Sequence, residues 1–250
     1  MLKFIGTGDL VNLENGNTSA YIKRDENLFV IDCGTLAFAR MMELNLFDDV
    51  KNVYFVITHN HPDHIGGLAS TLLYLHFWKN IIAKVVVCSE DDYAQRDDIE
   101  MLLSIQGVGE DDYEFIDDNQ VECFKDLKNI KFNKINHSSS IDSFALELTF
   151  NDKILHFLGD NNDAEYIGNI VKTLGENDII YTDCTTLNLK TSVHITLKEL
   201  AKLVPEAKRK QVVCMHQAKE DNLEEIRQYG FLVAQKEQSK REYLNKIKLH

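Results

Sequence analysis

Residues with metal-binding side chains crowd into one short segment, THNHPDHIGG, at positions 58–67. In a chain of 250 residues with only 9 histidines, this segment contributes His59, His61, Asp63 and His64. Imidazole and carboxylate ligands suit zinc, manganese or iron, and the residues alone do not choose among these metals. The two leading histidines alternate, so their rings point to one side, and the turn at Pro62 brings the other two ligands towards a second position. The segment therefore predicts one half of two adjacent metal sites.

The elements that position this segment are indicated by short β-branched and aromatic runs, which predict strands. The runs cover residues 2–6, 19–23, 28–32, 53–58, 84–88, 130–135, 144–150, 153–159, 178–182 and 211–216. Helical periodicity covers residues 36–47, 67–80, 195–204 and 222–230, the last two capped by Thr196 and by Asp221 or Asn222. Several strands are apolar throughout, which is typical of burial on both faces. The pattern predicts an α/β fold in which two mixed sheets carry helices outside, in one domain over residues 1–250.

Several histidines and aromatic residues outside the segment are expected to have structural roles. His76 and His156 are expected to pack or to support the site from behind, and Tyr74, Phe77 and Trp78 are expected in the core. Two acidic stretches, at 89–100 and 109–118, are interpreted as a solvated loop and helix excursion rather than as a lid over the site.

Charge excludes one class of partner. The formal net charge is −13, whereas proteins that hold long nucleic acids normally present a basic surface. The basic run PEAKRKQ, at 205–211, is interpreted as a solvated helix end. We therefore do not expect a long nucleic acid as partner.

Cysteine use and hydropathy bear on location. The five cysteines are far apart and form no CxxC pair, which favours reduced, buried thiols. No apolar run is long enough to span a membrane, and the opening MLKFIG has no signal-peptide pattern. We expect a cytoplasmic protein without a membrane partner.

The motif and its companions resemble the metallo-β-lactamase superfamily. THNHPDHIGG looks like the signature of that superfamily, and matching elements follow in order: His137 in NHSSS, Asp160 in HFLGDN and His216 in VVCMHQ. The early FIGTG and FVIDCG match its N-terminal strands, with Asp32 ending a strand beside the site. The resemblance covers nearly the whole chain and implies the four-layer αββα sandwich of that superfamily.

The resemblance also implies a ligand set for two divalent metal ions. One ion would be held by His59, His61, His137 and Asp160, and the other by Asp63, His64, Asp160 and His216, with Asp160 bridging. Zinc is expected, with manganese as the alternative. Asp63 is also expected to take part in catalysis. Two such ions can activate a shared water and clamp a phosphodiester.

Within the superfamily, DCTTLNLKTSVHITLKELAKL resembles the tRNase Z group, where an acidic residue precedes a histidine that opens a helix. His194 would be that histidine, a proton donor to the leaving O3′, and Asp183 would orient it, although the group has Glu there. Only 23 positions separate His137 from Asp160, which leaves no room for the arm that grips tRNA in that group.

The arm-less relatives closest in architecture are the cyclic-mononucleotide phosphodiesterases that oppose Pycsar immunity, which are homodimers. The resemblance therefore implies hydrolysis of a 3′,5′-cyclic mononucleotide to the 5′-monophosphate by a homodimer. A tRNase Z-like ribonuclease and a hydrolase of esters, thioesters or lactones are the alternatives. NHSSS in place of a GHTPG-like string speaks against the latter, and a complete ligand set speaks against a non-catalytic nucleotide sensor.

Overall fold

Two six-stranded sheets form the centre of the molecule. A computed structural model describes residues 1–89, 94–187, 193–240 and 242. The N-terminal sheet runs in chain order from β1 to β6: β1 (Lys3–Gly6), β2 (Ser19–Arg24), β3 (Asn27–Ile31), β4 (Asn52–Val56), β5 (Ala83–Val87) and β6 (Tyr113–Asp117). The C-terminal sheet has the order β12-β11-β10-β9-β8-β7: β7 (Leu127–Ile135), β8 (Ser143–Phe150), β9 (Ile154–Phe157), β10 (Ile179–Asp183), β11 (Val212–Met215) and β12 (Leu232–Val233). Both sheets are mixed.

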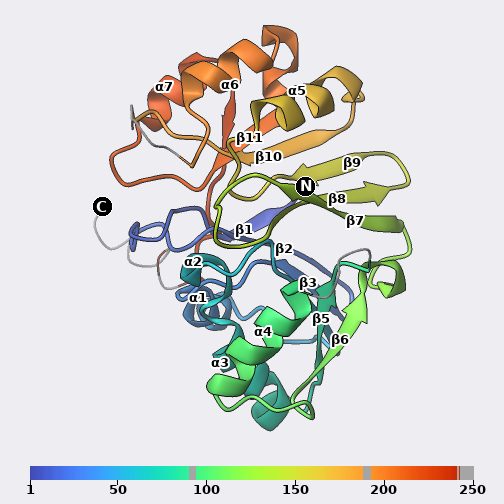
Figure 1. Cartoon of the computed structure of the whole chain (residues 1–250). Helices are drawn as coiled ribbons and strands as arrows, with labels where there is room; N and C mark the ends of the chain where they lie inside the picture. Colours follow the sequence, from blue (N-terminus) through green and yellow to red (C-terminus); the bar gives the residue numbers. More distant parts are fainter. Residues whose placement is uncertain (90–93, 188–192, 241, 243–250) are drawn as a thin grey trace.

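Helices cover the outer face of each sheet (Figure 1). Beside the N-terminal sheet lie α1 (Ala37–Glu43), α2 (Pro62–Ile65), α3 (Leu68–Tyr74), its π-helical continuation (Leu75–Lys79) and α4 (Ala94–Ile105). Beside the C-terminal sheet lie α5 (Ala164–Thr173), α6 (Leu197–Leu203), a 3-10 turn (Glu206–Gln211) and α7 (Leu223–Gln228). A further 3-10 turn (Asp118–Gln120) follows β6. Within the described residues, no helix is long and apolar enough to cross a membrane.

Three apolar clusters fill the three interfaces between these four layers. Strand β3 shows how: Leu28 and Val30 pack towards the N-terminal helices, while Phe29 and Ile31 pack between the sheets. Alternate residues of a strand face opposite sides, so a strand buried on both faces must be apolar throughout. The predicted αββα architecture is confirmed.

The directions of the strands bring the predicted site residues to one edge of the C-terminal sheet. Strands β9, β10 and β11 are parallel, and β7 shares their direction because β8 runs antiparallel to both of its neighbours. Their carboxyl ends lead into the segments that carry His137, Asp160, Asp183 and His216. The two sheets meet there as well, because Phe144 N–H at the start of β8 donates to the Thr58 carbonyl at 2.9 Å. Open α/β sheets commonly place their sites at such an edge.

All ten predicted strands are present, but other elements differ from expectation. The acidic stretch at 109–118 contains β6, which joins the N-terminal sheet as an edge strand, so its interpretation as an excursion was wrong. The stretch at 89–100 includes the start of α4, and residues 90–93 lie outside the described part. Helix α5 and strand β12 were not predicted. Thr196 and Asn222 are the observed caps of α6 and α7.

The aromatic residues after α3 do not all enter the core. Tyr74 packs against the core cluster of the N-terminal half, but Phe77 and Trp78 are 65% and 72% exposed, so the core prediction was wrong for these two. The π-helical turn at Leu75–Lys79 departs from the helical period on which that prediction rested. His156 is buried, as expected, with Nδ1 3.8 Å from Glu147. His76 is partly exposed and bonds Asp112, away from the site.

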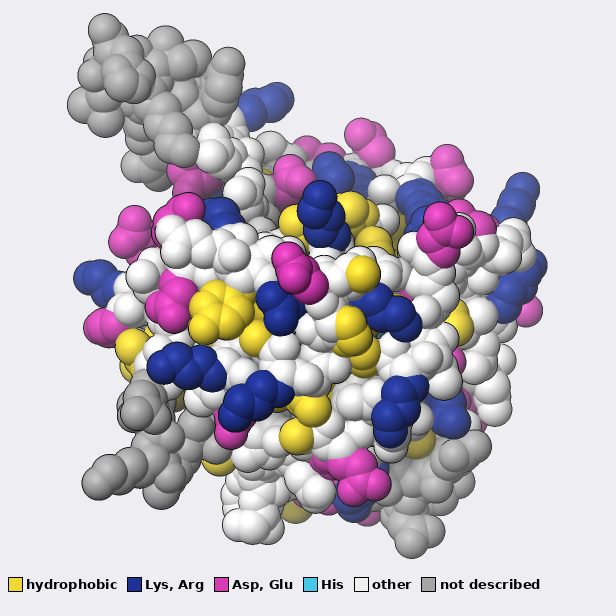
Figure 2. Space-filling model, turned by 90° about the horizontal axis from the view of Figure 1, so that it is seen from above, with side chains coloured by type: hydrophobic (Ala, Val, Ile, Leu, Met, Phe, Trp, Pro, Cys, Tyr) yellow, Lys and Arg dark blue, Asp and Glu magenta, His cyan; other side chains and the backbone are white. Residues whose placement is uncertain are grey.

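The basic run at 205–211 has a structural explanation. Arg209 donates to the carbonyls of Val204, Ala201 and Tyr229, and the Lys208 ammonium donates to those of Val171 and Leu174. Figure 2 shows the face over α5, α6 and α7, where Lys and Arg side chains are interspersed with Asp and Glu. This face therefore offers no continuous basic surface for a polyanion.

Candidate metal centre

The ligand-bearing loop after β4 is held against the loop after β3 by backbone hydrogen bonds. Cys33 N–H donates to the His64 carbonyl at 2.7 Å, and Thr35 N–H donates to the Pro62 carbonyl at 3.1 Å. Pro62 opens α2, a position where its missing N–H costs nothing. Between the two loops lies Gly34, where an added Cβ would stand 2.0 Å from the Asp63 carbonyl oxygen. The two loops can pack this closely only because residue 34 has no side chain.

Replacing Gly34 with Ala should therefore displace the loop that carries the ligands. We expect the free energy of unfolding to fall by about 2 kcal/mol or more, since the contact is with backbone that cannot rotate away. Gly168→Ala in α5 is the control, because its Cβ would meet nothing closer than Leu203 Cδ2 at 3.9 Å. Chemical denaturation of both variants measures the difference. Equal stability of the two variants would contradict the packing argument.

The first cluster consists of His59, His61, His137 and Asp160, whose ligand atoms all lie within 4.8 Å of one another. His59 Nε2 is 3.0 Å from His61 Nδ1 and 3.9 Å from Asp160 Oδ2. His137 Nε2 is 3.4 Å from the same His61 nitrogen and 3.7 Å from Asp160 Oδ2. Burial lowers the pKa of each of the three histidines, so they are held in the neutral form that ligates metals.

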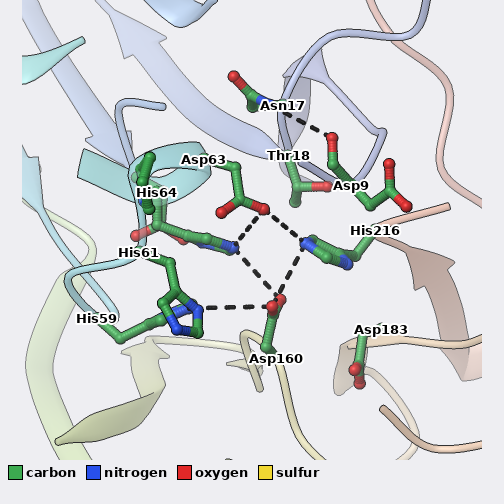
Figure 3. A network of polar contacts seen from close by, with 12 residues as sticks. Asp9, Asn17, Thr18, His59, His61, Asp63, His64, Asp160, Asp183 and His216 are labelled. Atoms are coloured by element: carbon green, nitrogen blue, oxygen red, sulfur yellow. Dashed lines mark hydrogen bonds and ion pairs between the residues drawn. The ribbon is translucent and has the colours of Figure 1, made fainter. Parts of the chain in front are cut away.

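The second cluster consists of Asp63, His64, Asp160 and His216, again within 4.8 Å (Figure 3). His216 Nε2 lies 3.2 Å from Asp63 Oδ2 and 3.3 Å from Asp160 Oδ2. His64 Nε2 lies 3.4 Å from Asp160 Oδ1. Asp160 thus belongs to both clusters, which is the position that a bridging carboxylate would occupy. Burial raises the pKa of Asp160, but the charges of His216 and His64 outweigh burial and hold it well below its usual range.

His216 reaches the cluster through an unusual backbone conformation. Its φ is +55°, a left-handed value that is uncommon for residues other than glycine and that the surrounding structure must constrain. The constraint comes from the next residue, because Gln217 N–H donates to the Thr7 carbonyl at 2.9 Å and its own carbonyl accepts from Asp9 N–H at 3.1 Å. The loop between β1 and β2 therefore fixes this ligand from the other sheet.

Asp32 stands behind both clusters. It is fully buried, with a φ of +62°, and accepts from His64 Nδ1 at 2.8 Å and from the Thr58 backbone N–H at 2.7 Å. The Thr58 hydroxyl, also bonded to Asp32, lies 3.1 Å from His59 Nδ1. One carboxylate thus orients a ligand of each cluster, a common arrangement around metal-bound histidines.

Replacing Asp32 with Asn should weaken metal binding without changing a ligand. We expect affinity for divalent metal to fall roughly 10- to 100-fold, because an amide is a weaker acceptor for His64 Nδ1 and for Thr58, whose hydroxyl contacts His59 Nδ1. Isothermal titration with Zn²⁺ measures the change. Asp126→Asn, which alters an ion pair with Arg24 on the surface, is the control and should bind metal as the parent does. Unchanged affinity in the Asp32 variant would refute the role.

His194 and Asp183 form a pair beside the second cluster. His194 Nδ1 lies 2.8 Å from Asp183 Oδ2 and 4.0 Å from Asp160 Oδ2. Burial disfavours the charged imidazole, but the hydrogen bond and charge of Asp183 prevail and raise the pKa of His194 to about 9. Burial raises the pKa of Asp183 to about 6. At neutral pH the pair is therefore an imidazolium bonded to a carboxylate.

The donor atoms fit two divalent ions. Tetrahedral zinc with nitrogen and oxygen ligands near 2.0 Å sets its ligands about 3.3 Å apart, close to the separations seen in the second cluster. Among the described residues, His64 Nε2 and Asp160 Oδ1 are buried without a hydrogen-bond partner although they point at each other. Buried polar atoms are seldom left unsatisfied, and a bound cation would satisfy both. The two buried His/Asp clusters have the composition and spacing of a dinuclear metal site.

Every residue expected at the site lies in this group, and several contributors were missed. Thr58 and Ser143 join the edges of the two sheets beneath the site, where His59 and Ser143 form an isolated β-bridge. The left-handed conformations of Asp32 and His216 were not foreseen either. A metal site is recognised in a sequence by the side chains that ligate the metal. Residues that only support those ligands, such as Thr58 and Ser143, cannot be recognised in this way.

The layers and the clusters place the chain among proteins of the metallo-β-lactamase fold that carry a His/Asp metal site. The chain is similar to the metallo-beta-lactamase fold protein YhfI from Bacillus subtilis, with a TM-score of 0.69 and 14% identity over 95% of this chain and 96% of that one. It is similar to the short form of human tRNase Z, with a TM-score of 0.64 and 17% identity over 94% and 96%. It is also similar to a diphosphatase from the PhnP family, with a TM-score of 0.66 and 14% identity over 95% of each chain.

Within this class, the chain belongs to the Anti-Pycsar protein Apyc1 family, whose model matches residues 1–239. Anti-Pycsar protein Apyc1 from Paenibacillus harenae is 25% identical over 229 residues, which are 86% of this chain and 88% of the relative. The protein of the same name from Saccharibacillus brassicae is 37% identical over 68 residues, 27% of each chain. The resemblance stated from the sequence is thereby confirmed.

Proposed function

We propose that the chain is a dinuclear-metal phosphodiesterase that opens a 3′,5′-cyclic mononucleotide to the nucleoside 5′-monophosphate. The observation that carries the proposal is the pair formed by His194 and Asp183. His194 Nδ1 lies 4.0 Å from Oδ2 of Asp160, the carboxylate shared by both clusters. Membership of the Anti-Pycsar protein Apyc1 family supports a cyclic nucleotide as substrate. Activity of this kind would counter cyclic-nucleotide immune signalling.

The residues divide the reaction between them. Two divalent metal ions, when bound, would lower the pKa of a water and neutralise phosphate oxygens. Water adds to phosphorus, the bond from phosphorus to O3′ breaks, and its electron pair leaves with O3′. Because Asp183 holds Nδ1 of His194, Nε2 is the nitrogen that gives its proton to O3′, and the water's own proton passes to solvent. Asp63 would be a metal ligand, and its contact with His216 Nε2 orients its carboxylate.

A small substrate fits the length of the connection between His137 and Asp160. Strands β8 and β9 take up most of this interval and are joined by a short turn, in which Phe150 N–H donates to the Lys153 carbonyl. No part of it extends as an arm that could hold tRNA.

Further parts of the proposal concern metal and assembly. Zinc is favoured by the histidine-rich donor sets, with manganese as the alternative. We also propose one domain, because ligands from both sheets meet in one centre. A homodimer would cover the apolar side chains that α4 exposes, Met101 at 60% and Ile105 at 78%. Burial of four cysteines, Cys33, Cys123, Cys184 and Cys214, supports a cytoplasmic location.

Product analysis tests the reaction. Metal-loaded protein is incubated with 3′,5′-cyclic mononucleotides, cyclic dinucleotides, bis(p-nitrophenyl) phosphate, pre-tRNA and a lactone, in parallel with an Asp63→Ala, His64→Ala double variant. We expect cyclic mononucleotides to yield 5′-monophosphates, and the double variant to be inactive. A 3′-monophosphate product would contradict the role of His194. Turnover of the lactone or of pre-tRNA alone would overturn the proposed function.

A further inference from the structure

The carboxylate of Asp221 collects hydrogen bonds from two loops at the site edge. Its Oδ1 accepts from the Thr185 hydroxyl at 2.9 Å and from the N–H and hydroxyl of Thr186 at 2.6 and 3.0 Å. Its Oδ2 accepts from Ala218 N–H at 2.8 Å. Asp221 is only 9% exposed, so these bonds are largely shielded from water. A buried carboxylate with donors on both oxygens fixes its neighbours firmly.

One of these loops carries the proton donor. Thr185 lies two residues after Asp183, and its backbone pairs with the chain beside His194: Thr185 N–H donates to the Ile195 carbonyl at 3.1 Å, and Leu197 N–H donates to the Thr185 carbonyl at 2.8 Å. The place of Thr185 therefore sets the places of both Asp183 and His194. Asp221 in turn holds the Thr185 side chain.

The other loop carries a ligand of the second cluster. Ala218 lies two residues after His216, and the residue between them, Gln217, is anchored to the loop between β1 and β2 by four hydrogen bonds. Asp221 thus fastens the segment of His194 to a segment that is already fixed at the metal centre. His194 and His216 lie side by side, with ring centroids 5.0 Å apart.

We propose that Asp221 is a positioning residue for His194: it holds the imidazole where its proton can reach the leaving O3′. This rests on the proposed function, and it adds a residue that touches neither metal nor substrate. A carboxylate is needed because all of its partners donate. The NH₂ group of an asparagine would face either Ala218 N–H or Thr186 N–H. Because both of these groups donate, the hydrogen bond on that side would be lost.

Leaving-group dependence separates this role from general damage. A cyclic nucleotide releases an alkoxide that needs a proton, whereas bis(p-nitrophenyl) phosphate releases a phenolate that does not. For Asp221→Asn we expect kcat on the cyclic mononucleotide to fall about 10-fold or more, and kcat on the aryl diester to change less than about 2-fold. Thr185→Val, which removes one bond to Asp221, should show the same selectivity to a smaller extent. Both variants should bind two zinc ions per chain.

A matched control comes from Asp178, which also joins two segments through its carboxylate. Its oxygens accept from Ile154 N–H and Gly175 N–H, each at 2.7 Å, at the end of β9 and β10 remote from the metal centre. Asp178→Asn should lose stability without changing the ratio of the two activities. Combined with His194→Asn, Asp221→Asn should cause no additional loss, because both changes remove the same proton transfer.

A readout independent of substrate is the NMR signal of the His194 Nδ1 proton in zinc-loaded protein. The bond to Asp183 should shift this signal strongly downfield, and Asp221→Asn should weaken or broaden it while Asp178→Asn leaves it intact. Equal loss on both substrates, loss of zinc, or an unchanged signal in Asp221→Asn would overturn the proposal. If parent protein cleaves no cyclic mononucleotide, the proposed function fails, and the NMR comparison alone decides the role of Asp221.

Discussion

Replacing Asp160 with Asn should strip the protein of both metal ions and of its activity. Asp160 is the residue common to the two clusters, and His59, His64, His137 and His216 all place a ring nitrogen within 3.9 Å of its oxygens. Asparagine keeps the shape but loses the charge and one acceptor oxygen, so it cannot bridge two cations. We expect fewer than one ion per chain and a fall in kcat of at least about 1,000-fold, or about 4 kcal/mol in the barrier.

Metal analysis of the dialysed protein, together with turnover of a cyclic mononucleotide, measures this effect. Asp163→Asn is the control, because Asp163 is only three residues away and caps α5 by accepting from Tyr166 N–H. Asparagine caps helices as well as aspartate does, so this variant should keep its metal and its activity. Two ions retained by the Asp160 variant would show that the clusters are independent sites.

The residues of the centre could be predicted because metal ligation depends on side-chain chemistry. The types and spacing of the His and Asp residues indicate metal ligation directly, and each of the four ligand-bearing segments follows a strand that was predicted from the sequence. Strand β7, which precedes His137, mixes apolar and polar residues. The segment at 58–67 could be recognised from its residues alone, whereas His137, Asp160 and His216 were assigned from the resemblance to the superfamily. The strand directions that bring these ligands to one edge were not predicted. The Asp183 and His194 pairing, at 2.8 Å, lies in the arrangement expected from the resemblance.

What escaped prediction depends on tertiary context. Strand β6 is rich in acidic residues, and it is a strand because β5 offers an edge to pair with, which composition does not reveal. Trp78 is exposed because a π-helical turn interrupts the period of α3. Asp32 was expected beside the site only through the resemblance, and Asp221 was expected only as a candidate helix cap, so the hydrogen bonds that each accepts were not predicted. Their roles come from donors that lie 26 to 32 positions away for Asp32 and 35 to 36 for the threonines bonded to Asp221.

Replacing His194 with Asn should remove proton donation and leave the metal centre in place. The imidazole is not a member of either four-residue cluster, so two ions per chain should remain. General acid catalysis contributes roughly 100- to 10,000-fold, and we expect kcat on a cyclic mononucleotide to fall by about 100-fold or more. Turnover of bis(p-nitrophenyl) phosphate should hardly change. Loss on both substrates alike would mean that His194 binds the phosphate rather than protonating the leaving group.

The pH dependence of the parent protein should carry the same signature. His194 can give a proton only while it is an imidazolium, and its pKa is raised to about 9 by Asp183 after burial has acted against it. The acid form is therefore present below that pH and is lost above it, so kcat on a cyclic mononucleotide should fall as pH rises through about 9. Bound cations repel the proton and would move this limb to lower pH. The limb should be absent from His194→Asn and from turnover of the aryl diester by the parent, because neither reaction uses this proton.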